Sequence, residues 1–213
     1  LPESSISPVS TLPSYEALTA EDPTLLKSTV VLKLNGGLGT GMGLEKAKSL
    51  LPLKGKDTFL DFIAKQVLHM REAFGVELEI MLMNSFSTSD DTKEYLCSKY
   101  PEFASEWAAI EMVQNKVPKV DAKSKAPAEW PKNPSLEWCP PGHGDLYPAM
   151  LGSGTLDKLL AKGFKYMFVS NSDNLGATMD LTHLTWCRLH ACPTWYMSMS
   201  MSICICMSRR CIS

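Results

Sequence analysis

Apolar and polar positions follow two different rhythms along the first 181 residues of this chain. Short runs rich in leucine, methionine and β-branched residues predict buried strands; they cover residues 30–34, 79–84, 109–113 and 164–170. The segments between these runs predict helices; they cover residues 58–74, 91–99, 145–150 and 154–161. Because strands alternate with helices, we expect an α/β fold in which a parallel sheet carries helices on its faces.

The ends of the longest predicted helix are marked by residues that favour helix termini. Thr58 is a good N-cap, since its hydroxyl can accept a hydrogen bond from the first turn, and Gly75 stands where a glycine commonly ends a helix. The proline- and lysine-rich residues 118–141 predict a long irregular loop. Such a loop in a compact domain is usually functional.

Two segments fall outside this alternation, so the domain proper is expected at 30–181. Residues 1–29 hold four prolines and predict a lead-in with short turns at 15–18 and 24–26 that pack on the domain. Residues 182–213 become repetitive, with alternating Met-Ser and Ile-Cys units. We interpret them as an out-of-frame or read-through tail without order. The alternative is an edge strand, for which apolar–polar alternation is also typical.

Composition narrows the functional classes. The 213 residues are 45% hydrophobic, enough for a core, and 21 basic against 23 acidic residues give no electrostatic support for nucleic-acid or membrane-surface binding. No apolar run is long enough to span a bilayer. The chain starts with Leu1, and we expect a fragment or a processed form.

Cysteine usage differs between the two parts of the chain. Only Cys97 and Cys139 fall in the first 186 residues, which suits a reducing compartment and predicts a cytoplasmic protein. The other five cysteines crowd the end of the chain; they are Cys187, Cys192, Cys204, Cys206 and Cys211. With His183 and His190 nearby, a zinc-binding interaction module is an alternative function, but the spacings do not match paired C-x2-C knuckles.

The most informative stretch follows the first predicted strand. Five glycines lie within eight residues; they are Gly36, Gly37, Gly39, Gly41 and Gly43. Glycine lets a backbone turn sharply and approach a ligand closely, and successive exposed N–H groups form a concavity suited to phosphate. Lys48 follows on the expected first helical turn, where its charge would complete a phosphate site.

Spacing excludes the two commonest glycine-loop motifs. A Walker A loop needs a lysine directly after its last glycine, but Leu44 follows Gly43. A G-x-G-x-x-G fingerprint fails in every frame, because Met42, Leu44 or Lys46 stands at the third glycine position. A surface turn without a ligand remains the simpler alternative, although five clustered glycines favour phosphate or nucleotide binding over it.

The stretch LNGGLGTGMG, followed by Lys48-Ser49, resembles the nucleotide-binding loop of eukaryotic UDP-glucose pyrophosphorylases (UTP–glucose-1-phosphate uridylyltransferases). The motifs MLMNSFST, QNKVPK, PPGHGD and FVSNSDNLGA have counterparts in the same order, so the resemblance covers about 30–181. It implies a Rossmann-like nucleotidyltransferase domain, truncated and without the family's C-terminal β-helix. It also implies Mg²⁺ and the reaction of UTP with glucose 1-phosphate to UDP-glucose and pyrophosphate.

The resemblance assigns roles to individual residues. Implied UTP-binding residues are Leu34, Asn35, Gly36, Gly37, Lys48, Gln114, Gly142 and Asp173. Implied sugar-phosphate residues are Gly36, Gly37, His143, Asn171, Ser172 and Asp173. Lys48 is the implied catalytic residue. Where many relatives have Gly-Pro before this lysine, the chain has Lys46-Ala47.

Side-chain chemistry agrees with several of these roles. The Gln114 amide offers an acceptor and two donors, which complements the imide edge of uracil. Asp173 follows a predicted strand, where one carboxylate can hold Mg²⁺ whose shell is completed by phosphate and water; a plain surface turn is the alternative. We interpret His143 as a positioning donor, because an ionised phosphate nucleophile needs no base.

Two further functions stay open at this point. A non-catalytic UTP-binding module would have the same loop and uracil contact without turnover. A pyrophosphorylase of broader sugar specificity is the second, because the family's further sugar contacts lie in a C-terminal half that the resemblance does not reach.

Overall fold

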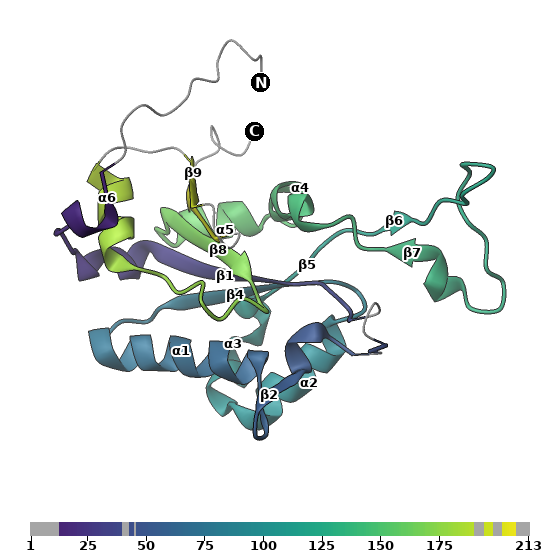
Figure 1. Ribbon diagram of the computed structural model, residues 1–213, viewed down its shortest axis with the longest axis horizontal. Coiled ribbons are helices and arrows are strands. Elements are labelled where there is room, and N and C mark those ends of the chain that lie inside the picture. The colour runs from purple at the N-terminus through teal and green to yellow at the C-terminus, as the bar shows by residue number, and fades with distance from the viewer. Residues whose placement is uncertain (1–12, 40–42, 45, 190–193, 198–201, 208–213) are drawn as a thin grey trace, which may run out of the picture.

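The computed structural model describes residues 13–39, 43–44, 46–189, 194–197 and 202–207. Its centre is a six-stranded sheet in the order β5-β4-β1-β8-β10-β9 (Figure 1). The strands are β1 Thr29–Asn35, β4 Glu79–Asn84, β5 Glu111–Val113, β8 Tyr166–Asn171, β9 Thr194–Met197 and β10 Ser202–Cys206. Strands β5, β4, β1 and β8 run parallel, whereas β10 runs antiparallel to both β8 and β9.

Helices cover both faces of the sheet, so the fold is α/β as predicted. They are α1 Phe59–Phe74, α2 Ser89–Lys99, α3 Pro101–Ile110, α4 Leu146–Gly152, α5 Thr155–Ala161 and α6 Leu181–Leu189. Figure 1 shows α1, α2 and α3 on one side of the sheet and α4 and α5 on the other. Strand β1 is buried along its whole length, because it lies between β4 and β8 and is covered from both faces.

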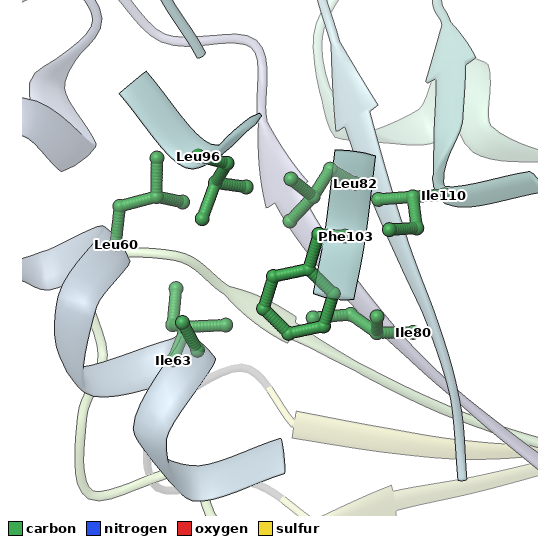
Figure 2. A pocket seen from close by; sticks show the side chains of 8 residues that line it. Leu60, Ile63, Ile80, Leu82, Leu96, Phe103 and Ile110 are labelled. Atoms are coloured by element: carbon green, nitrogen blue, oxygen red, sulfur yellow. The ribbon is translucent and has the colours of Figure 1, made fainter. Parts of the chain in front are cut away.

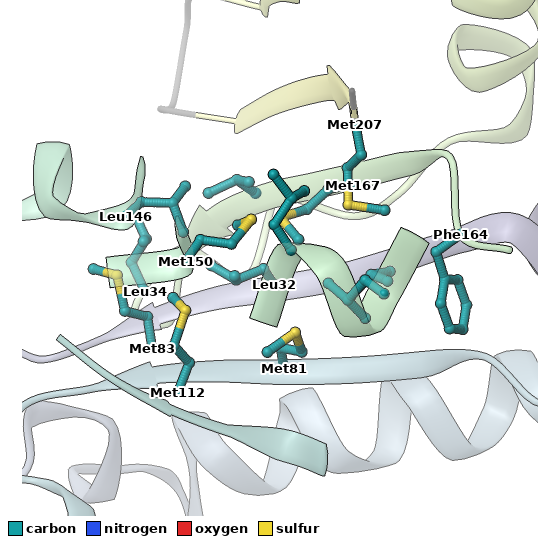
Figure 3. Packing of buried hydrophobic residues seen from close by; sticks show 14 residues of the cluster. Leu32, Leu34, Met81, Met83, Met112, Leu146, Met150, Phe164, Met167 and Met207 are labelled. Atoms are coloured by element: carbon teal, nitrogen blue, oxygen red, sulfur yellow. The ribbon is translucent and has the colours of Figure 1, made fainter. Parts of the chain in front are cut away.

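Side-chain alternation along the strands divides the core into layers. Val30, Leu32 and Leu34 of β1 pack with residues of β4, β8, α4 and α5 in one apolar cluster (Figure 3). Val31 points to the opposite face and joins a cluster that includes Leu25 and other residues before the sheet. A period of two residues is the expected pattern for a strand with helices on both faces.

Helix α1 begins and ends as its sequence predicts. Thr58 Oγ1 accepts from the Asp61 N–H at 3.2 Å, and the Asp61 carboxylate accepts from the Thr58 N–H at 2.8 Å, which is a capping box. Gly75 ends the helix with a φ of 61°, in the left-handed region. The apolar face of α1 packs through Leu60 and Ile63 on β4, α2 and α3 (Figure 2).

Asp61 also holds α1 to α2. Its buried carboxylate accepts from the Tyr95 and Tyr100 hydroxyls, each at 2.7 Å, and pairs with Lys99 at 2.7 Å. Burial alone would raise the pKa of this carboxyl. The donors from Lys99, Thr58 and the two tyrosines outweigh burial and hold the Asp61 pKa well below its usual range.

Most predicted elements are present, with two differences. Helix α3 was not expected. It includes residues 109–110, which were predicted to begin the strand 109–113, so the strand starts at Glu111. The predicted loop 118–141 contains a short two-stranded ladder, β6 Val117–Pro118 with β7 Trp138–Cys139, at the base of an arm that projects from the domain (Figure 1). The lead-in turns are confirmed by 3₁₀ helices at Tyr15–Ala17 and Pro23–Ser28.

The expectation of a tail without order from residue 182 is wrong for the described part of that segment. Helix α6 buries Leu184, and its Thr185 hydroxyl accepts from the Asp22 N–H at 2.9 Å. Strand β10 pairs with β8 over five residues, and Met207 is buried in the core. The alternative interpretation, strand pairing at the sheet edge, describes these residues better. Whether 182–213 is an out-of-frame sequence stays a prediction.

Candidate functional site

The candidate site lies where the parallel strands end. The chain leaves β1 through α1 to reach β4 on one side, whereas β8 lies on the other side of β1. In open α/β sheets, ligands bind outside the carboxyl ends of the strands at such a reversal of strand order. Gly36 follows β1, Gln114 follows β5, and Asp173 comes two residues after the end of β8.

Gly36 is glycine because the Gln114 amide occupies the space of a side chain. A Cβ on Gly36 would lie 1.8 Å from Gln114 Nε2 and 3.1 Å from its Cδ. Gln114 itself is 6% exposed, and its backbone N–H donates to the Asn84 carbonyl at 2.8 Å. The fold therefore brings the predicted uracil-binding side chain into contact with the predicted phosphate loop.

The glycine loop closes on itself through its backbone. The Lys48 N–H donates to the Gly37 carbonyl at 3.1 Å, and Leu38 and Ala47 form an antiparallel bridge. This closure returns Lys48 to the start of the loop. Gly41 and its neighbours in 40–42 lie outside the described residues.

Lys48 and Asp173, 125 residues apart in sequence, meet at this site. Lys48 Nζ donates to Asp173 Oδ2 at 2.5 Å. Their side chains are 40% and 30% exposed, so both remain accessible to a ligand. Lys48 opens a three-residue 3₁₀ helix, Lys48–Leu50, and not a longer helix.

The base of the projecting arm carries the other predicted contacts. Asp145 accepts from the Asn115 N–H at 2.7 Å and from Asn115 Nδ2 at 3.0 Å, which ties the exit of β5 to the 3₁₀ helix His143–Asp145. Gly142 precedes this helix with a φ of 109°, a conformation that favours glycine. His143 is exposed. Asp145 thus holds together the segments that carry Gln114, Gly142 and His143, a role that sequence reasoning missed.

Two predicted UTP-binding residues use their side chains elsewhere. The Leu34 side chain is part of the apolar core. Asn35 Nδ2 donates to Asn84 Oδ1 at 2.8 Å and to Thr92 Oγ1 at 3.0 Å. Any contact of Leu34 or Asn35 with a nucleotide would therefore come from the backbone.

Asn35 belongs to a polar ladder across three strand ends. Asn84 also bonds to the next strand, because its Nδ2 donates to Glu111 Oε1 at 2.8 Å. The same Glu111 oxygen accepts from the Ser89 hydroxyl at 2.6 Å. The ladder fixes the carboxyl ends of β1 and β4 and the start of β5 relative to one another. Asn84 stands in the quoted MLMNSFST motif, but its partners cannot be found from local spacing.

Three buried side-chain oxygens have no hydrogen-bond partner within the described part of the chain: Ser49 Oγ, Gln114 Oε1 and Asn171 Oδ1. Each belongs to a segment that ends at this site. Buried polar atoms are nearly always hydrogen-bonded, so each of these oxygens calls for a partner such as water or a polar ligand. The neighbouring Ser172 is held by the sheet, because its N–H donates to the Leu34 carbonyl at 3.1 Å.

The donor set suits Mg²⁺ bound together with phosphate. Asp173 contributes a single accessible carboxylate, and the described residues contain no group of three or more His, Cys, Asp or Glu side chains that could hold a metal by themselves. Mg²⁺ usually takes one or two protein carboxylates and keeps water and substrate phosphates as its other ligands.

The strand order, the glycine loop and the Lys48–Asp173 pair together define a nucleotidyltransferase-like α/β domain. A family model described as UTP–glucose-1-phosphate uridylyltransferase matches residues 1–199, and the chain belongs to this family. The match extends past residue 181, where the motif resemblance ended.

Curated relatives carry the same family name. The chain is 45% identical over 163 residues to UTP–glucose-1-phosphate uridylyltransferase of Solanum tuberosum, and 42% identical over 171 residues to that of Saccharomyces cerevisiae. These alignments cover 76% and 78% of this chain but 34% of each relative. The chain thus spans about a third of the length of these relatives.

Solved structures agree with the fold. UDP-glucose pyrophosphorylase from Leishmania major, in a mutant complex with UDP-glucose, superposes with a TM-score of 0.81 at 49% identity, covering 91% of this chain and 41% of that one. A Trypanosoma brucei UDP-glucose phosphorylase gives a TM-score of 0.82 at 48% identity, covering 91% and 42%. Within the described residues, no helix is long and apolar enough to cross a membrane.

Proposed function

We propose that this chain carries the UTP-binding site of an enzyme that transfers the uridylyl group of UTP to glucose 1-phosphate, giving UDP-glucose and pyrophosphate. The observation that carries the proposal is the Gln114 amide, which lies against Gly36 of the glycine loop and whose Oε1 is buried without a hydrogen-bond partner among the described residues. Family membership supplies the identity of the nucleotide.

The Gln114 amide suits the uracil base. Its Oε1 is buried without a partner in the described residues, and an imide N–H of uracil would satisfy it. The Gly142 backbone would hold the opposite edge of the base. Because an unpaired buried acceptor rejects a base that offers no donor there, this arrangement favours UTP over CTP.

The phosphates would lie against the glycine loop and Lys48. Gly37 has no neighbour within 4 Å of a would-be Cβ, so its backbone is open to close approach. Lys48 pairs with Asp173 in the unliganded chain, and each neutralises the other. Nucleotide binding would transfer the Lys48 ammonium from Asp173 to the phosphates and free the Asp173 carboxylate.

The reaction is an in-line displacement at the α-phosphorus of UTP. A phosphate oxygen of glucose 1-phosphate forms the new bond to this phosphorus, and the bond to the bridging oxygen of pyrophosphate breaks. Lys48 would offset the negative charge that grows on the leaving pyrophosphate. His143, Asn171 and Ser172 would position the sugar phosphate for attack. Mg²⁺, with Asp173 as its protein ligand, would supply further charge neutralisation at the phosphates.

The same site also fits a UTP-binding module without turnover, or a pyrophosphorylase that accepts other sugars. A cytoplasmic location is part of the proposal, supported by the free thiols of Cys97 and Cys139.

Calorimetry on the purified chain tests binding. UTP and CTP are titrated with Mg²⁺ and again with EDTA. We expect UTP to bind more tightly than CTP, and Mg²⁺ to strengthen UTP binding. Equal affinities for the two nucleotides would refute the role of Gln114, and an absence of binding would refute the site. Pyrophosphate release with glucose 1-phosphate and with other sugar 1-phosphates then separates the enzyme from the module and from the broader pyrophosphorylase.

A further inference from the structure

Strand β1 contains a buried lysine that the proposed function does not use. Lys33 is 4% exposed, and within the described residues no carboxylate lies at ion-pair distance from it. Burial lowers the pKa of the Lys33 ammonium to about 8. A buried charge without a countercharge is costly, so a lysine in an otherwise apolar strand calls for an explanation.

The Lys33 ammonium has two hydrogen-bond acceptors. Its Nζ donates to Ser170 Oγ at 2.8 Å and to the Ala177 carbonyl at 3.0 Å. The nitrogen also lies 5.8 Å from the centre of the Phe168 ring. These contacts all reach from β1 to β8 and to the segment that follows β8.

The two acceptors lie on either side of the segment 171–176, which carries Asp173. Inside the segment, two turn hydrogen bonds are long: the Asn174 N–H to the Asn171 carbonyl and the Ala177 N–H to the Asn174 carbonyl, both 3.3 Å. Besides the Lys48–Asp173 pair, the segment is held from β1, at its start by the Leu34 carbonyl and on both flanks by Lys33.

We propose that Lys33 is a positioning residue that fixes the 171–176 segment so that Asp173 can take part in binding metal and nucleotide together. This inference rests on the proposed function. Lys33 acts through Ser170 and Ala177 and touches neither the nucleotide nor the metal. Partners that orient a metal ligand commonly change metal affinity or activity by about 10- to 100-fold when they are removed.

The position tolerates an apolar side chain of similar length. A cavity of about 270 Å³ lies beside Lys33, between β1, α1 and the residues around Ala177. Lys33→Met keeps a similar side-chain length and removes a buried charge that has no countercharge, which offsets the hydrogen bonds lost at Ser170 and at the Ala177 carbonyl. We therefore expect this variant to fold with an unchanged or raised melting temperature.

The test compares UTP affinity with Mg²⁺ and with EDTA in wild type, Lys33→Met and Lys27→Met. Lys27 is an exposed lysine just before β1 and serves as the matched control. In Lys33→Met we expect the Mg²⁺-dependent gain in UTP affinity to fall by about tenfold. Affinity in EDTA should stay within about twofold, because Gln114 and the glycine loop are untouched. Lys27→Met should behave as wild type.

A second variant and a second readout complete the test. Ser170→Ala removes one acceptor without changing any charge, and we expect a smaller loss of the Mg²⁺-dependent gain, about two- to fivefold. Mn²⁺ bound with UTP gives a paramagnetic resonance signal that reports the metal directly. A full Mg²⁺-dependent gain in folded Lys33→Met, or no effect of Ser170→Ala, would overturn the role of Lys33. If Mg²⁺ does not raise the UTP affinity of wild type, the proposed metal–nucleotide site itself is refuted.

Discussion

Replacing Gly36 with alanine should separate recognition of the base from recognition of the phosphates. The added Cβ would lie 1.8 Å from Gln114 Nε2, so the amide must leave its buried place. If the amide makes two hydrogen bonds to uracil at about 0.5–1.5 kcal/mol each, their loss costs about 1–3 kcal/mol, or roughly 5- to 150-fold in Kd. We expect Gly36→Ala to weaken UTP binding within this range and to reduce the preference for UTP over CTP.

Two other glycines provide the comparison. Gly152, at the end of α4, has nothing within 4 Å of the place where a Cβ would stand, and Gly152→Ala should bind both nucleotides as wild type does. A Cβ at Gly37 would likewise have no neighbour within 4 Å. A loss of nucleotide affinity in Gly37→Ala would therefore report close approach of the phosphates to this backbone, and it should affect UTP and CTP alike. Titration calorimetry of both nucleotides measures all three variants. A wild-type preference for UTP in folded Gly36→Ala would refute the reasoning.

Three further substitutions test other parts of the site and the fold. Asp173→Asn should abolish most of the Mg²⁺-dependent gain in UTP affinity without lowering the melting temperature; an unchanged gain would place the metal elsewhere. Asp145→Ala should loosen the exit of β5 and weaken UTP binding about threefold by calorimetry, since the Asn115 contacts are solvent-accessible; unchanged affinity would contradict this. Because the folded-state pKa of Asp61 is depressed, its stabilisation is complete above about pH 4 and is lost as pH falls below that value. Urea unfolding should therefore show a steeper acid loss of stability in wild type than in Asp61→Asn, which should be about 1–3 kcal/mol less stable at pH 7; parallel pH profiles would contradict the assignment.

The elements that were predicted correctly are those whose signal is local. Period-two burial and helix caps lie within a few residues of one another, so β1, β4 and α1 follow from the sequence with small errors at their ends. Helix α3 was missed although its buried side chains, Phe103, Trp107 and Ile110, recur at helical spacing after a proline suited to the first turn.

The contacts that organise the site depend on tertiary structure. The glycine loop could be predicted from composition, but the Lys48–Asp173 pair joins residues 125 positions apart, and the pairing of Asn35 with Asn84 joins neighbouring strands. The pairing of β10 with β8 depends in the same way on the position of the sheet edge. Local periodicity contains no information about such partners. The expectation that Asn35 contacts UTP came from the family resemblance and stays a prediction.

The closed base of the projecting arm has a consequence for engineering the molecule. Asn115 and Asp145 are joined at the domain, and β6 pairs with β7 just beyond them, so the arm leaves and returns through a fixed base. Lengthening a surface loop costs little once its ends are fixed, about 0.6 kcal/mol for each doubling. The tip around Lys125 should therefore accept an inserted reporter domain or an affinity tag with little effect on melting temperature or on UTP affinity.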